Sequence, residues 1–268
     1  MIKLVSMTTM CADIYDGDGS IFPGGEALNL AAAACRYDGI SVSLMGAIGD
    51  DECGQAIIRS VKSMPVDISS VHIIKDGVTA SNRIYLTESG DRYFKPDSWT
   101  NGVYGDYSPD EKDKEKLKNS DVVFITYDSP CFNEIIELKK SGSFVLAVDF
   151  NEKQDIEVLE KYFPYIDIFF ISGKEFMLPL LKRYSERYKC LFNATLAENG
   201  SVTFCGGREY RTAAVPVSAA EDTTGCGDSY HGAFICSYAL HRDIPKAMED
   251  GSKAAAEVIS HKGGFLYE

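Results

Sequence analysis

The sequence predicts an α/β fold in which helices cover both faces of a mostly parallel central sheet. Apolar runs alternate with amphipathic runs along the chain, as they do in successive β–α–β units. The runs VVFI, FVLAV and IFFI are apolar at every position, which is typical of strands buried on both faces. With 268 residues, 45% of them hydrophobic, the chain is long enough for one large core. We therefore expect a single domain over residues 1–268.

The first third of the chain supplies two strand–helix pairs. IKLVSM (2–7) and SVSLMGAIG (41–49) have the apolar character of strands. GGEALNLAAAACRY (24–37) places its apolar residues at helical spacing, and DECGQAIIRSVKSM (51–64) begins with an acidic first turn. Each strand is therefore expected to feed a helix that packs back on the sheet.

The same alternation continues to the C-terminus. Strands are expected at 121–127, 144–150 and 166–172, and helices at 132–142, 155–163, 226–241 and 245–260.

Two segments interrupt this rhythm. Residues 79–97 alternate apolar and polar side chains around Ser89-Gly90-Asp91, which indicates a β-hairpin. Residues 13–25, DIYDGDGSIFPGG, are rich in Gly and Asp. Together they suggest a small β lid, formed by about 13–22 and 80–96, over one edge of the main sheet. An ordinary surface hairpin fits the pattern equally well.

Composition narrows the possible partners. The net charge of −13 argues against binding to nucleic acid or to an anionic membrane, because both require a basic surface. The eight cysteines are scattered without a C-x-x-C pair, which argues against zinc and favours small buried residues in a reducing compartment. The N-terminus lacks the features of a signal peptide, and no run approaches the ~20 apolar residues of a membrane span. We expect a cytoplasmic protein.

The segment EDTTGCGDSYHGAF (221–234) carries the strongest chemical signal. Gly225 and Gly227 let the amides of Gly225, Cys226 and Gly227 turn toward one point at the start of a helix, which makes an anion hole. Asp228 in the first turn suits a general base that takes a proton from an attacking hydroxyl. Helix capping by a threonine is the alternative, but it does not explain two glycines and a further acid, Asp222.

This segment also resembles a known signature. DTTGCGD followed by SYHGAF is similar to the D-T-x-G-A-G-D signature of the ribokinase-like (PfkB) carbohydrate kinases. PGGEALNLAAAACRYDGISVSLMGAIGDDECG resembles the early segment of that family, TLAENGS its nucleotide segment, and SHKGGF its C-terminal segment. The resemblance covers nearly the whole chain in the right order.

The resemblance implies a Rossmann-like three-layer sandwich with a β lid, and transfer of the γ-phosphoryl group of ATP to a sugar hydroxyl with the help of Mg²⁺. By position, Asp228 would be the base, in an anion hole of Gly225, Cys226 and Gly227. Residues that would bind sugar hydroxyls are Asp13, Gly25 and Asn29. Gly25 would permit a ligand to approach the backbone closely.

Further roles follow from the same resemblance. The positions implied for the nucleotide are Thr195, Gly200, Thr223, Ala254, Val258 and Gly263, with Ala255 beside them. Simple core packing is an alternative for the apolar members of this set. Glu175 would organise Mg²⁺ through water, and Asp222 and Thr224 stand where some relatives bind a monovalent cation, so K⁺ is a further candidate.

The chain departs from the family pattern at several positions. Ser172 replaces an asparagine that contacts phosphate, and Ala197 replaces a glycine of the nucleotide loop. Thr8 stands where a glycine is common before the sugar-binding aspartate, and Cys226 replaces an alanine. A catalytically weak nucleotide-binding or regulatory protein on the same fold therefore stays an alternative.

Within the family, the chain is most similar to members that act on glycated amino acids. The acceptor would then be the 6-hydroxyl of a fructose–amino-acid conjugate such as fructoselysine, and another hexose or a nucleoside is the alternative. The ammonium of such a conjugate calls for acids beyond Asp13, and the candidates are Glu26, Asp16 and Asp18.

The hairpin is also expected to present an apolar outer face. The reason is that Ile84, Tyr85, Leu86, Tyr93 and Phe94 cannot all be buried beneath so small a sheet. We expect this face to pair with a second copy in a homodimer.

Overall fold

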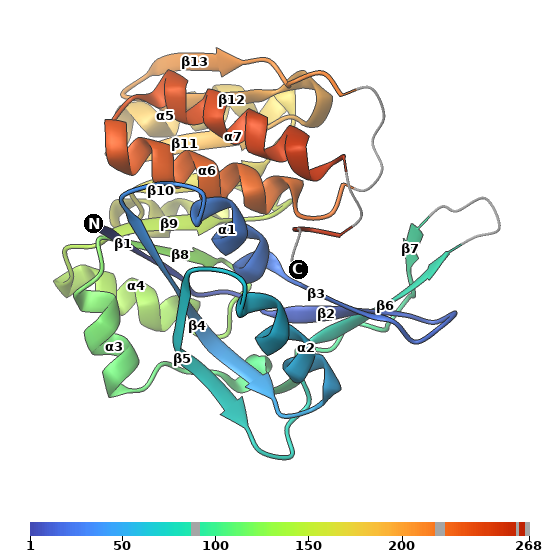
Figure 1. The fold of residues 1–268 in the computed structure, drawn as a ribbon. Helices are drawn as coiled ribbons and strands as arrows, with labels where there is room; N and C mark the ends of the chain where they lie inside the picture. Colours follow the sequence, from blue (N-terminus) through green and yellow to red (C-terminus); the bar gives the residue numbers. More distant parts are fainter. Residues whose placement is uncertain (87–91, 218–222, 261–262, 266–268) are drawn as a thin grey trace.

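The computed structural model describes residues 1–86, 92–217, 223–260 and 263–265 (Figure 1). Its centre is a nine-stranded sheet in the order β13-β12-β11-β10-β9-β8-β1-β4-β5. In that order the strands are Arg208–Thr212, Ser201–Cys205, Leu191–Thr195, Ile168–Ser172, Val145–Asp149, Val122–Thr126, Ile2–Ser6, Ile40–Gly49 and Val66–Ile74. All neighbours from β5 to β11 pair in parallel, and β12 and β13 close the far edge in antiparallel pairs. The expectation of a mostly parallel sheet is confirmed.

Helices lie on both faces of this sheet because successive strand residues point to opposite sides. Leu4 and Phe124 belong to the core under α1 (Glu26–Ala34), α2 (Glu52–Val61), α6 (Cys226–His241) and α7 (Ile244–Val258). Their neighbours Val5 and Ile125 belong to the opposite core, under α3 (Glu111–Lys118), α4 (Phe132–Ser141) and α5 (Leu178–Arg187). The result is the three-layer sandwich that the sequence predicted (Figure 1).

In the described part of the chain, four 3-10 helices complete the main body. They are η1 (Gly102–Asp106), η2 (Glu157–Tyr165), η3 (Glu175–Met177) and η4 (Ala197–Asn199). The α-helix expected at 155–163 is wrong, because Glu157–Tyr165 forms the 3-10 helix η2, which contains Pro164. Proline has no amide hydrogen and its ring clashes with the preceding turn, so a continuous α-helix is unfavourable there.

A smaller four-stranded sheet extends from one side of the molecule (Figure 1). Its order is β3 (Ile21–Gly24), β2 (Cys11–Tyr15), β6 (Ser81–Leu86) and β7 (Arg92–Phe94). β2 pairs with β6 in parallel, and β6 pairs with β7 as the expected hairpin. The expected turn at Ser89–Asp91 lies outside the described residues. The two interrupting segments therefore do combine into one sheet.

The apolar residues of the small sheet differ in exposure. Ile84 is fully buried, whereas Tyr85 keeps 40% of its surface exposed. The two differ because alternate residues of a strand point to opposite faces of the sheet. The side chains of Leu86, Tyr93 and Phe94 lie outside the described part of the chain.

The contact between α1 and α6 positions the site. The two helices pack side by side on the same face of the main sheet (Figure 1). A Cβ atom at Gly232 of α6 would lie 2.7 Å from the carbonyl oxygen of Leu30, so a larger residue would force the helices apart. This close crossing brings the N-terminal turn of α6 against the first turns of α1.

Candidate active site

The N-terminus of α6 is shaped by Gly225. Gly225 has a φ of 77°, in the left-handed region that residues with a Cβ atom seldom adopt. A Cβ atom here would also lie 2.8 Å from the Cα of Gly264 and 3.0 Å from Nδ2 of Asn29. Only glycine satisfies both constraints, which accounts for the first glycine of the motif.

The first turn of α6 borders a large cavity. Cys226 and Gly227 line this cavity, and the first amides of a helix lack intrahelical acceptors and carry partial positive charge. The amide of Cys226 donates a long hydrogen bond (3.3 Å) to the carbonyl of Thr223 and so closes the turn. This bond holds Cys226 in the turn that begins α6, and the anion hole expected from Gly225, Cys226 and Gly227 stays a prediction.

Asp228 points the other way, toward α1. Asn29 Nδ2 donates to Asp228 Oδ2 over 2.9 Å, and Asn29 is only 2% exposed. Burial raises the pKa of Asp228, while the hydrogen bond from Asn29 and the nearby His231 act in the opposite direction. A carboxylate with a raised pKa is a stronger base than an exposed one, as abstraction of a hydroxyl proton requires.

Two further carboxyls and one thiol lie around Asp228. Burial, followed by the charge of Asp228, raises the pKa of Glu26 to about 8. Burial also raises the pKa of Asp149 to about 7, again with a contribution from Asp228. The pKa of the Cys11 thiol is raised well above its ordinary value by burial and then by the charges of Asp13, Glu26 and Asp228. The part of the site around Asp228 is thus strongly acidic.

A chain of buried hydroxyls ends at Glu26. The hydroxyl of Thr8 donates to Glu26 Oε2 and lies 2.9 Å from the hydroxyl of Thr126. Thr126 lies 3.0 Å from Ser129, to which the Tyr104 hydroxyl donates over 2.9 Å. Thr8 therefore replaces the usual glycine with a hydrogen-bond donor to a carboxyl, which sequence reasoning did not anticipate.

His231 lies one turn after Asp228, and sequence reasoning missed it. Its ring packs on Phe170 with centroids 4.3 Å apart, and Nδ1 lies 3.6 Å from Asp149 Oδ2. Among the described residues, neither ring nitrogen has a hydrogen-bond partner. Burial lowers the pKa of His231 to about 4, so the ring is neutral near pH 7. The only sequence signal was a polar residue within the apolar run of the motif.

The cavity on the other side of the α6 N-terminus has a volume of about 900 Å³. This is ample for a ligand of nucleotide size. Thr195, Gly200 and Thr223, all expected at a nucleotide, line it. Its remaining walls include Ala255 and Ala256 of α7 and Ile259, which directly follows that helix. Val215 and Val217, which follow β13, also line it.

The register of α7 differs from the expectation. Ala254 and Val258 line a separate, smaller cavity, and Gly263 is not among the residues that line the large one. Neighbouring residues of an α-helix point about 100° apart, so Ala254 and Ala255 face different cavities. Of the alanines considered for the adenine wall, the structure places Ala255 at the large cavity.

Two departures from the family pattern also lie at this cavity. Ser172 lines it at the end of β10, and Ala197 lines it in η4. Ala197 has a φ of 50°, in the left-handed region where a glycine has no steric cost. The loop therefore keeps the path that a glycine would take, with some strain at Ala197.

Of the three metal candidates, Glu175 and Thr224 lie in the described part of the chain. Glu175 is exposed, with 61% of its side chain accessible, and Arg211 Nη1 lies 3.3 Å from its Oε1. Thr224 is half-buried just before α6. Asp222 lies outside the described residues.

Gly25 is required by the chain's own packing. Its φ is 94°, and a Cβ atom there would lie 2.4 Å from the carbonyl oxygen of Thr9 and 2.9 Å from the amide nitrogen of Cys11. The backbone of the chain makes a close approach at this glycine, and its expected contact with a sugar stays a prediction. Gly25 thus lets the start of α1 pack against the start of β2, which carries Asp13.

The acids considered for a substrate ammonium are arranged unequally. Asp16 lies 2.7 Å from Arg83 and 3.0 Å from Lys95, so its charge is already balanced. Asp18 accepts a hydrogen bond from the amide of Ser20 in the β2–β3 turn. Asp13 is half-buried on β2.

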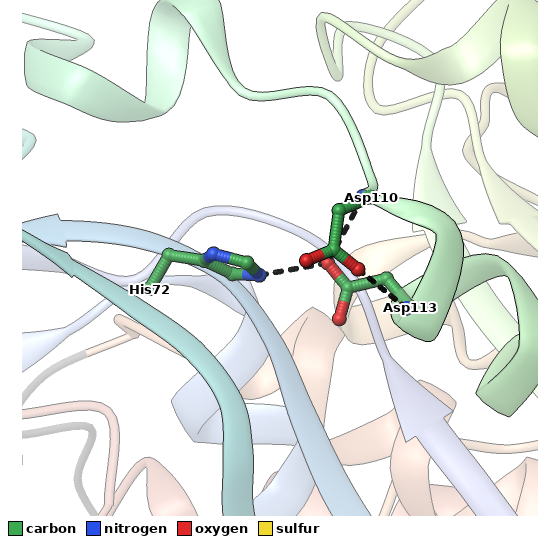
Figure 2. Close-up of side chains that lie close together, drawn as sticks. All are labelled: His72, Asp110 and Asp113. Carbon is green, nitrogen blue, oxygen red and sulfur yellow. Dashed lines mark hydrogen bonds and ion pairs between the residues drawn. The ribbon is translucent and has the colours of Figure 1, made fainter.

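A second cluster of titratable groups lies away from this site. Figure 2 shows His72 of β5 pointing toward Asp110 and Asp113 at the start of α3. His72 Nε2 lies 2.8 Å from Asp113 Oδ2, which also accepts from the Tyr107 hydroxyl. Asp110 caps α3 by accepting from the amides of Lys112 and Asp113. These bonds join β5 to the start of α3 and account for the cluster without a metal.

Among the described residues, no helix is both long enough and apolar enough to cross a membrane.

Comparisons with known proteins agree with this arrangement. The pfkB family of carbohydrate kinases matches the chain over residues 1–266. Fructoselysine 6-kinase of Shigella flexneri is 32% identical over 268 residues, covering 99% of this chain and 100% of that protein. Fructosamine kinase of Bacillus subtilis is 25% identical, covering 99% of this chain and 94% of that protein. The structure of Arabidopsis thaliana ribokinase with ribose and ATP has a TM-score of 0.82 at 17% identity, covering 98% of this chain and 94% of that chain.

Proposed function

Because this chain belongs to the pfkB family of carbohydrate kinases, we propose that it transfers the γ-phosphoryl group of ATP to the 6-hydroxyl of a fructose–amino-acid conjugate such as fructoselysine. The chain is an ATP-dependent sugar kinase. The observation that carries the proposal is the two-sided N-terminus of α6. Cys226 and Gly227 line a cavity of about 900 Å³, while Asp228 faces α1 on the opposite side.

This geometry separates a donor side from an acceptor side. A nucleotide in the large cavity would bring its terminal phosphate to the first-turn amides of α6, where the helix dipole favours negative charge. An acceptor hydroxyl beside Asp228 would give up its proton to the carboxylate as its oxygen attacks the phosphorus. The bond from phosphorus to the bridging oxygen breaks, and ADP leaves. Asn29 holds the base in place for this step.

The choice of a cationic conjugate rests on the relatives and on the local charge. Both fructoselysine 6-kinase and fructosamine kinase match this chain over nearly its full length. Asp13 lies on β2 and Asp18 lies in the turn between β2 and β3, whereas Asp16 is already paired with two cations. A partly desolvated charge pair with a substrate ammonium would contribute about 1–3 kcal/mol, or roughly 5- to 150-fold in kcat/KM over the neutral sugar.

Cations complete the proposal. Glu175 has the hard carboxylate oxygens that Mg²⁺ prefers, is exposed to solvent, and would hold the ion through water. Mg²⁺ would offset charge on the phosphates of bound ATP. Thr224 and Asp222 stay candidates for K⁺, which a comparison of turnover in potassium and in tetramethylammonium salts tests.

We also propose that two copies associate through the small sheet. Tyr85 exposes 40% of its surface on this sheet, while Ile84 is buried and drops out of the interface. Light scattering at micromolar concentration should give twice the mass of the chain, and a monomeric mass would contradict the dimer.

The substrate proposal is tested by ADP release with MgATP and a panel of acceptors. Fructoselysine, fructose, ribose and a nucleoside are compared by kcat/KM under identical conditions. The conjugate should give the highest value. If fructose or ribose equals or exceeds it, the conjugate assignment is wrong and only the sugar-kinase assignment survives. If none is turned over, a nucleotide-binding protein without kinase activity is the better description.

A further inference from the structure

Glu26 shares one face of α1 with the residue that holds the base. It is the first residue of the helix, and Asn29 follows three positions later, so both side chains lie on the same side. Asn29 donates to Asp228, and the charge of Asp228 acts strongly on Glu26. Two carboxyls that share a site in this way cannot both ionise easily, because like charges repel at short range.

The surroundings of this pair are poor in cations. The titratable groups and hydroxyls around it are Asp228 and His231 of α6, Asp149 of β9, Cys11 and Asp13 of β2, and Thr8 and Thr126. Among the described residues, the side-chain hydrogen bonds of Glu26 and Asp228 come from Thr8 and Asn29, and neither involves a lysine or an arginine. His231 is neutral near pH 7, because burial lowers its pKa to about 4. A second negative charge would therefore have no counter-ion.

Hydrogen-bond acceptors are in excess here. Asn29 Oδ1 is buried and has no donor among the described residues. Asp228 and Asp149 add carboxylate oxygens on the adjacent elements. Buried acceptors without donors are costly, at about 1–3 kcal/mol each, so a proton retained in this cluster is favourable. Glu26 can retain it on one oxygen while its other oxygen accepts from Thr8.

We infer that Glu26 works as a neutral carboxylic acid, which keeps its proton beside ionised Asp228 and so limits the charge that meets the incoming γ-phosphoryl group. Of the two carboxyls, Asp228 loses its proton first, because the hydrogen bond that Asn29 donates stabilises its ionised form. Loss of the second proton would place an additional negative charge next to the first turn of α6. That charge would repel the terminal phosphate of ATP and oppose the helix dipole. Glu26 thus acts indirectly, by limiting the negative charge beside Asp228, and takes no part in the chemical step.

The inference rests on the kinase activity proposed above and predicts an alkaline limit to it. In the wild-type protein, kcat/KM for MgATP should fall above a pH of about 8, by up to about tenfold per pH unit, as Glu26 ionises. Glu26→Gln keeps an oxygen that accepts from Thr8 but cannot ionise. Between about pH 7 and about pH 9 the variant should therefore retain its kcat/KM, while the wild type loses about tenfold.

A matched control removes the same charge elsewhere. Glu137→Gln acts on α4, where Glu137 is exposed and pairs with Lys140, far from the α6 N-terminus. It should keep the wild-type pH profile. An alkaline limb that persists unchanged in Glu26→Gln overturns the inference, as does a wild-type profile without such a limb.

Infrared spectroscopy tests the proton without turnover, and so separates this inference from the kinase proposal. The unliganded wild-type protein should show the carbonyl stretch of a protonated carboxyl that disappears as the pH rises through about 8. Glu26→Gln should lack this component and keep one from Asp149, whose pKa burial raises to about 7. A wild-type spectrum identical to that of Glu26→Gln in this band would overturn the inference, even if the sugar-kinase activity were confirmed.

Discussion

Asn29 Nδ2 donates to Asp228 Oδ2 over 2.9 Å, although 199 positions separate the two residues in the chain. The bond joins the first turns of α1 and α6, and Gly232 makes their close approach possible. It fixes the carboxylate on the side of the α6 N-terminus opposite to the large cavity. The proposed base and the proposed nucleotide therefore use different faces of one short loop.

Replacing Asp228 by asparagine tests the base. Asp228→Asn keeps the size of the side chain but cannot take up the hydroxyl proton, so kcat should fall by ~10²–10⁴. ATP affinity, measured by calorimetry, should change little, because Asp228 does not line the large cavity. Asn29→Ala in the same background should add little to the loss, since the carboxylate that Asn29 holds in place is already absent. A kcat near that of the wild type would refute the assignment.

The two glycines at the start of α6 form a matched pair. Gly225→Ala places a Cβ atom 2.8 Å from Gly264 in a left-handed conformation, so it should lower the unfolding free energy by about 1–3 kcal/mol and weaken ATP binding. Gly227→Ala meets nothing within 4 Å and should fold as stably as the wild type. Denaturant unfolding of both variants compares them. Equal losses of stability would show that the backbone at Gly225 is not the constraint.

Helix α7 offers a second matched pair, one residue apart. Ala255→Leu extends into the large cavity, so the KM for ATP should rise by about tenfold or more, as crowding of a bound ring predicts. Ala254→Leu extends into the smaller cavity and should leave the KM for ATP within about twofold of the wild type. Initial-rate kinetics over a range of MgATP concentrations decide between them. The reverse pattern would mean that adenine binds where the sequence first placed it, at Ala254.

His231 should make the protein sensitive to acid. Burial holds its pKa at about 4 in the folded state, against 6.5 for an ordinary histidine, so below 6.5 the unfolded state takes up a proton that the folded state does not. Stability from this residue is therefore present above 6.5 and lost as the pH falls toward 4. Between about pH 7 and about pH 5 the loss is about 2 kcal/mol.

His231→Phe keeps a ring against Phe170 and removes this titration. Its unfolding free energy, measured in urea, should fall about 2 kcal/mol less than that of the wild type over the same pH interval. The same fall in both proteins would show that another group carries the acid sensitivity.

Much of this molecule follows from local patterns in the sequence. Apolar runs without alternation predicted strands buried on both faces, because helices must cover both sides of a parallel sheet. Gly225 and Asp228 predicted a helix start with an adjacent carboxylate, because glycine and acidic residues act there through local backbone geometry and the dipole. These signals depend on a few neighbouring residues, so a single chain reveals them.

The tertiary structure decided which side chains meet. No spacing in the sequence places Thr8 beneath Glu26, Asn29 against Asp228, or His231 beside Asp149. The three alanines at 254–256 have no polar neighbour to set their register, so only the packing of α7 determined that Ala255 faces the large cavity. The environment of a buried group is created by segments distant in the chain, and burial and nearby charge are what set its pKa. The acidity of Glu26 and of the base is therefore a property of the fold, while their presence is a property of the sequence.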